Sequence, residues 1–144
     1  MSTSTAPIVV GVDESDTARR AAFNAANLAT ALSAPLHLVM AVSRTRSQTE
    51  PSGGADHWNV NWLTTAEQFL DALIGELPTQ HATRTVSLDD PAIAICAEAA
   101  RLDARMIIVG NRRVQGLSRV LGAVATDVAR HAQCDVLITN TIAP

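Results

Sequence analysis

Residues 8–15 have the sequence IVVGVDES, a run of five small or apolar residues followed by two acidic residues and a serine. Continuous apolar runs are typical of strands that are covered on both faces, as the strands of parallel sheets are. Four further runs of strand character follow along the chain, at residues 36–42, 83–88, 106–109 and 136–138. The run at residues 83–88 shows a weaker pattern than the others, an alternation of polar and apolar residues. We therefore predict a parallel sheet of five strands.

The segments between these runs have the apolar period of helices. One stripe runs from Ala18 to Leu32, with Ser15 placed to cap it. Three further helices are predicted: one over residues 62–77, one that starts at Asp90-Pro91, and one over residues 121–132. Strands that alternate with helices predict an α/β fold, a single doubly wound open sheet with four helices and right-handed crossovers.

Length and composition limit the domain organisation. The 144 residues suit one domain, which we assign to residues 7–144 after a disordered polar tail at residues 1–6. Residues 43–57 (SRTRSQTEPSGGADH) lack an apolar period and contain a Pro-Ser-Gly-Gly break. We expect a flexible loop there.

Charge and residue usage disfavour several classes of partner. The net charge is −3 and aromatic residues are 3% of the chain, so we expect neither nucleic acid nor membrane as a partner. All eleven basic residues are Arg, which excludes P-loop and Schiff-base lysines. No apolar run approaches the length of a membrane span. Two cysteines far apart suit buried thiols in a reducing compartment, and we expect a cytoplasmic protein.

In open α/β sheets, ligands bind beyond the carboxyl ends of the strands. Asp13 follows the first strand, and Ala41 and Val42 end the second. A carboxylate at Asp13 can accept a hydrogen bond from a ribose hydroxyl or hold a hydrated cation. The alternative is that Asp13 and Glu14 only place negative charge near a helix N-terminus.

The segment after the fourth strand is rich in glycine and arginine. Glycine permits the close approach and the positive φ that a phosphate cradle needs, and the segment leads into a helix N-terminus, which favours anions. The alternative is a connecting loop that uses glycine for turns and exposes its arginines. The candidate residues are Gly110, Arg112, Arg113, Gly116, Arg119 and Gly122.

Three stretches resemble the universal stress protein family: IVVGVDES; Asp90-Pro91 with the later MIIVGNRR; and GLSRVLGAVATDVARHAQCDVLIT. Together they span nearly the whole chain. The resemblance implies a Rossmann-like sheet in the order 3-2-1-4-5, of the adenine nucleotide alpha hydrolase type. It also implies a homodimer that pairs the last strands.

The resemblance further implies ATP as a ligand, with Mg²⁺ as its companion ion. Many members bind ATP through a motif of Gly, two residues, Gly, nine residues, Gly, then Ser or Thr. Asp13 matches the acidic nucleotide contact, Ala41 and Val42 the adenine site, and Gly110 the first motif glycine.

The remainder of that motif departs from the family pattern. Arg113 replaces the second glycine, the stretch to Gly122 is one residue short, and Ala123 replaces the hydroxyl residue. A lost hydroxyl donor to phosphate costs about 1.5–3 kcal/mol, but charge-assisted bonds from the arginines are of similar size. Thr126 is a candidate substitute hydroxyl.

Two functions of different classes follow, neither of them catalytic. The first is a stress-response protein with an adenine-nucleotide (ATP) cleft; the alternative is a nucleotide-free homodimeric interaction module. A small hydrolase or transferase that depends on Asp13 is a third hypothesis. We expect neither an enzyme nor a metal site, because the sequence has no Gly-x-Ser-x-Gly elbow and its four histidines have no repeated ligand spacing.

Overall fold

The computed structural model describes residues 5–42, 55–111 and 121–141. Its five parallel strands form one sheet in the order β3-β2-β1-β4-β5. The predicted α/β fold and strand order are therefore confirmed. The strands are β1 (Ile8–Val12), β2 (Leu36–Ala41), β3 (Ala82–Ser87), β4 (Met106–Gly110) and β5 (Asp135–Thr139).

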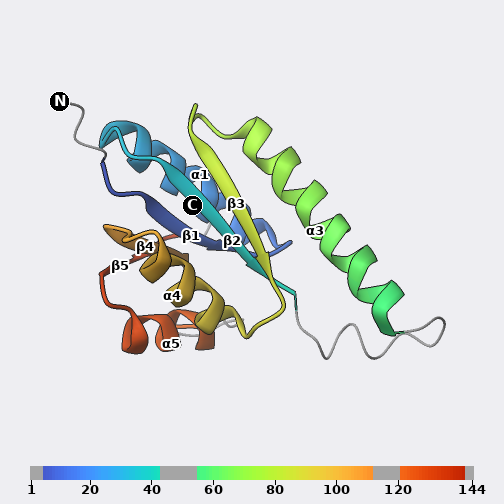
Figure 1. The fold of residues 1–144 in the computed structure, drawn as a ribbon. Helices are drawn as coiled ribbons and strands as arrows, with labels where there is room; N and C mark the ends of the chain where they lie inside the picture. Colours follow the sequence, from blue (N-terminus) through green and yellow to red (C-terminus); the bar gives the residue numbers. More distant parts are fainter. Residues whose placement is uncertain (1–4, 43–54, 112–120, 142–144) are drawn as a thin grey trace, which may run out of the picture.

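Helices cover both faces of the sheet, as Figure 1 shows. In the described ranges there are four of them: α1 (Asp16–Ala31), α3 (Ala55–Glu76), α4 (Pro91–Arg101) and α5 (Ala123–His131). Helices α1 and α3 pack on one face, and α4 and α5 on the other. Among the described helices, none combines the length and the apolar character needed to cross a membrane.

The central strands are buried because both of their faces carry apolar side chains. In β1, Ile8 and Val10 belong to the core under α1 and α3, whereas Val9 belongs to the core under α4 and α5. All three are fully buried. The edge strands β3 and β5 are more exposed, so the continuous apolar run correctly indicates two-sided burial for β1, β2 and β4.

Local sequence explains where two helices begin. The Ser15 side chain accepts a hydrogen bond from Ala18 N at 3.1 Å, which makes it the N-cap of α1 as predicted. Asp90 accepts from Ala92 N at 3.2 Å, and Pro91 occupies the first turn of α4. Both caps stand directly beyond the carboxyl end of a strand, and so they point helix N-termini toward that end of the sheet.

Two predicted boundaries are wrong. Helix α3 begins at Ala55, before the predicted start at Trp62, so the predicted loop over residues 43–57 extends too far. Its first residues, ADHWNVN, lack a helical apolar stripe. Helix α5 begins at Ala123, and Leu121 lies outside it with 44% exposure. Residues 43–54, the Gly-rich segment at 112–120 and most of the predicted tail lie outside the described residues.

Candidate functional site

The carboxyl ends of β1, β2 and β4 surround a cavity of about 300 Å³. The site lies where the chain order reverses, because β2 and β3 extend the sheet to one side of β1 while β4 and β5 extend it to the other. We call it the strand-end cavity. Its lining includes Gly11, Val12, Asp13, Ser15, Val39, Ala41, Pro91, Ile95, Val109, Gly110, Asn111, Gly122, Ala123, Val124 and Ala125.

The structure brings together most of the candidate residues that it describes. Asp13, Ala41, Gly110, Gly122 and Ala123 all line the strand-end cavity. Val42 lines instead a neighbouring cavity of about 360 Å³ on the α3 side, which also borders Asp13 and Ala41. Residues 112–120 lie outside the described ranges, and they contain Arg112, Arg113, Gly116 and Arg119.

The acidic turn holds Asp13 in place. Its Oδ1 accepts a hydrogen bond from Ser15 N at 2.7 Å, which closes an Asx turn between β1 and α1. Ser15 Oγ then caps the helix and lies 2.9 Å from Thr17 Oγ1. The α1 N-terminus is thus capped by Ser15, so the carboxylate of Asp13 borders the cavity without being needed as the cap.

Of the two described glycines of the loop, Gly110 lies in a tightly packed position, and Gly122 begins α5 with a negative φ. A Cβ at Gly110 would lie 2.9 Å from Thr141 Cγ2 and 3.5 Å from Ala21 Cβ, so a side chain there has no space. Gly122 is the N-cap of α5 with φ −65°, within the range of any residue. Neither glycine has a left-handed backbone, whereas the close packing around Gly110 leaves no room for a side chain.

The N-terminus of α5 faces the cavity without a side-chain cap. Gly122 makes no capping hydrogen bond, and the first-turn residues Ala123, Val124 and Ala125 line the cavity. Backbone N–H groups of an uncapped first turn are donors for an anion. The Thr126 hydroxyl, a predicted substitute for the missing serine, donates to Gly122 O at 3.0 Å. Its proton is thus already used within the first turn of α5.

Sequence reasoning did not identify every residue that lines the cavity. Asn111, Pro91 and Ile95 border it although none was a candidate. Asn111 could have been found from its position directly after a strand. Pro91 and Ile95 belong to α4, the helix that starts after β3. The described ranges bring together no group of three or more His, Cys, Asp and Glu side chains suited to a metal ion.

A sequence model of one family matches residues 5–140, almost the entire chain: the universal stress protein family. The chain belongs to this family. The match includes β1 with its acidic turn, the segment after β4, and α5 with β5. A comparison with the curated proteins finds no match.

Solved structures of universal stress proteins are similar over most of the chain. One from Archaeoglobus fulgidus has 26% identity and a TM-score of 0.69, covering 92% of this chain and 96% of that one. A universal stress protein in complex with cAMP has 28% identity and a TM-score of 0.65, covering 97% and 100%. The A. fulgidus protein in complex with dAMP has 26% identity and a TM-score of 0.67, covering 94% and 98%.

Proposed function

We propose that this universal stress protein binds an adenine nucleotide, foremost ATP, in the strand-end cavity and acts without catalysing a reaction on it. One observation carries the proposal: a single cavity joins the carboxylate of Asp13 to the uncapped first turn of α5. A hydroxyl acceptor and an anion site on one cavity suit a nucleotide, which presents ribose hydroxyls and phosphates. Its volume of about 300 Å³ is at the lower end for small-molecule sites.

Each part of the cavity has a role in this proposal. Asp13 accepts from the ribose, and the backbone at Ala41 meets the adenine at the end of β2. The backbone at Gly110 and the first turn of α5 from Gly122 to Ala123 receive the phosphates. The relatives solved with cAMP and dAMP hold adenine nucleotides, which supports the choice of base.

The same lining supports a binding role over a catalytic one. Among the described residues that line the cavity, one is acidic, Asp13. Its Oδ1 already accepts a hydrogen bond from Ser15 N. A Mg²⁺ ion that arrives with ATP would be held through phosphate oxygens, with Asp13 as the nearest carboxylate. General acid–base catalysis needs a positioned side chain to move a proton. We therefore expect ATP to be held and only slowly hydrolysed.

A second candidate function is a homodimeric interaction module with no nucleotide. It is favoured by the sheet edge at β5, where Leu137 is 41% exposed, since an unpaired edge strand can pair with another copy. The departure at Ala123, which lacks the family's hydroxyl, also favours it. In this case the strand-end cavity holds no nucleotide, and the surface that binds a second copy is the β5 edge of the sheet.

Calorimetric titration with ATP and Mg²⁺ tests the two candidates. We expect saturable binding to the wild type and binding at least tenfold weaker to Asp13→Asn, which keeps the size of the side chain but removes its charge. Asp103→Asn is the matched control, because Asp103 is exposed at the opposite end of the strands, before β4. Wild-type protein that takes up no ATP, ADP or cAMP at sub-millimolar concentration overturns the nucleotide proposal and leaves the interaction module.

A further inference from the structure

The chain beyond β5 returns to the end of β4 and bonds to Asn111, the residue before the glycine-rich segment at 112–120. Thr141 is 1% exposed, the least exposed polar residue of the described ranges. Its hydroxyl donates to Asn111 O at 2.8 Å and also lies 3.0 Å from Asn111 Oδ1. The backbone N–H of Thr141 donates to the same Oδ1 at 3.0 Å. Both oxygens of Asn111 are thus held by one residue, and we call this pair the Asn111–Thr141 latch.

Helix α1 holds the other side of the latch. Arg20 Nη1 donates to Thr141 O at 2.9 Å. Asn24 Nδ2 donates to Thr139 Oγ1 at 2.9 Å and to Asn140 O at 3.2 Å. The methyl group of Thr141 occupies the space beside Gly110 that a Cβ would need. The segment from β5 is therefore fixed to α1, and through Thr141 it fixes the backbone at Gly110 and Asn111.

Gly110 and Asn111 line the strand-end cavity, so the latch lies directly behind the proposed phosphate site. From these contacts we infer that Thr141 is a positioning residue for nucleotide binding, acting through Asn111. The inference rests on the proposed function, and it assigns a role in ligand affinity to a residue that does not itself line the cavity.

The physical reason is preorganisation. A loop that must be ordered when its ligand arrives lowers the affinity by the entropy lost in ordering. The latch removes part of that cost, because the backbone N–H and the hydroxyl of Thr141 already donate to Asn111, and Asn111 N donates to Thr139 O at 3.2 Å. Without the Thr141 hydroxyl, Asn111 O loses this donor and Asn111 gains freedom.

The test compares Thr141→Val, which keeps the shape of the side chain, with Thr141→Ser, which keeps the hydroxyl. By calorimetry with ATP and Mg²⁺, we expect Thr141→Val to bind about tenfold more weakly, the effect of about one lost hydrogen bond, and Thr141→Ser to recover wild-type affinity. Thr30→Val is the matched control, since the Thr30 hydroxyl donates to Pro78 O at 2.8 Å, outside the latch and the cavity lining, and its loss should leave the affinity unchanged.

Amide hydrogen exchange without nucleotide gives a second readout. We expect faster exchange at Asn111 and Thr141 in Thr141→Val than in Thr30→Val, at equal overall stability. A Thr141→Val variant that melts at a lower temperature but binds ATP like the wild type overturns the positioning role and leaves the proposed function intact. A wild type that binds no adenine nucleotide overturns the proposed function, and the positioning role with it.

Discussion

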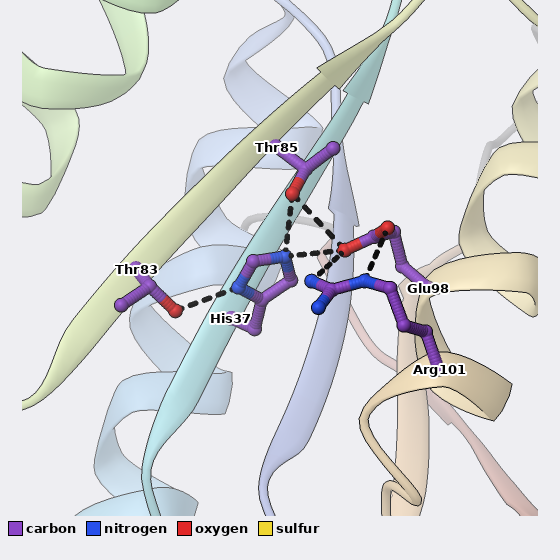
Figure 2. Close-up of polar contacts among 5 residues, drawn as sticks. All are labelled: His37, Thr83, Thr85, Glu98 and Arg101. Atoms are coloured by element: carbon purple, nitrogen blue, oxygen red, sulfur yellow. Dashed lines mark hydrogen bonds and ion pairs between the residues drawn. The ribbon is translucent and has the colours of Figure 1, made fainter.

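His37 lies on β2 with 4% exposure and places its ring among polar groups of β3 and α4. Its Nδ1 is 2.6 Å from Thr83 Oγ1, and its Nε2 is 2.9 Å from Thr85 Oγ1 and 3.0 Å from Glu98 Oε2. Figure 2 shows how these side chains converge on the ring, with the Arg101 guanidinium beside the Glu98 carboxylate. Because a carboxylate only accepts, Nε2 carries the proton and Nδ1 accepts from Thr83.

Burial has the largest effect on the pKa of the His37 ring. Desolvation lowers the pKa of His37 below its ordinary 6.5, against the opposing pull of the Glu98 carboxylate, and Arg101 lowers it further. The contact with Glu98 at neutral pH is therefore a hydrogen bond from a neutral imidazole. The Arg101 hydrogen bond, followed by that from Thr85, lowers the pKa of Glu98 to about 2 despite its partial burial.

The lowered pKa values of His37 and Glu98 predict how the stability of the fold depends on pH. A histidine whose pKa is lower in the folded state takes up its proton first in the unfolded chain, so stability falls as pH drops through 6.5 toward the folded pKa. The Glu98 contribution is present above its ordinary 4.5 and is lost as pH falls toward about 2. The two losses thus occupy separate pH windows.

We expect the free energy of unfolding of the wild type to decrease between about pH 7.5 and pH 5, and His37→Gln to show a flatter dependence over that range. Urea unfolding at several pH values measures both. Thr83→Val is the control, because it removes the partner of Nδ1 and lowers stability while the titrating ring stays. Parallel curves for the wild type and His37→Gln would disprove the assignment.

At the scale of elements, the proposed phosphate site includes the first turn of α5. Ala123 is its first residue, is exposed and lines the strand-end cavity. The family motif has Ser or Thr at this position, where a hydroxyl can donate to phosphate. We expect Ala123→Ser to tighten ATP binding roughly ten- to a hundredfold, the range of a hydrogen bond to a charged group.

Titration of Ala123→Ser beside the wild type measures the change, with Ala129→Ser as the control. Ala129 is exposed on the same helix, and it is not among the residues that line the cavity. Equal affinities of Ala123→Ser and the wild type would mean that the phosphates do not reach the first turn of α5.

The elements themselves were predicted well because strands and helices depend on local patterns. The continuous runs in β1, β2 and β4 coincide with the buried strands to within one residue at each end. The start of α3 at Ala55 was missed because its first turns lack an apolar stripe. Its remaining length has one: Ala66, Leu70, Leu73 and Leu77 are buried, the last of them just beyond its end.

The site could be predicted only where it follows from topology. The rule that ligands bind at the carboxyl ends of strands placed Asp13, Ala41 and Gly110 beside one cavity. It could not identify the Asn111–Thr141 latch, whose partners are 30 residues apart in sequence. That contact exists only once β4 and β5 have paired, so no local pattern marks it.

At the scale of the whole molecule, the two sheet edges differ. On the β3 side, α3 packs against the edge strand, and Asp71 of α3 accepts a hydrogen bond from Arg84 Nε of β3 at 2.8 Å. The β5 edge, at the other side of the sheet, exposes Leu137. If the chain forms the proposed homodimer, this asymmetry favours β5 as the pairing edge.

We expect sedimentation to find a dimer for the wild type and a shift to monomer for Leu137→Arg, which puts a charge into the pairing edge. Ile93→Arg is the matched control, since Ile93 is an exposed apolar residue of α4, away from β5. A dimer that survives Leu137→Arg but dissociates in Ile93→Arg would move the interface to the α4 face.

Mapping amide shifts by NMR while ATP and Mg²⁺ are added tests most directly whether the strand-end cavity holds the nucleotide. We predict saturable shifts centred on four residues that all line that cavity: Asp13 after β1, Ala41 of β2, Gly110 of β4 and Val124 of α5. Shifts confined to the cavity beside Cys96 and Cys134, between α4 and the start of β5, or no saturable shift at all, would contradict the account.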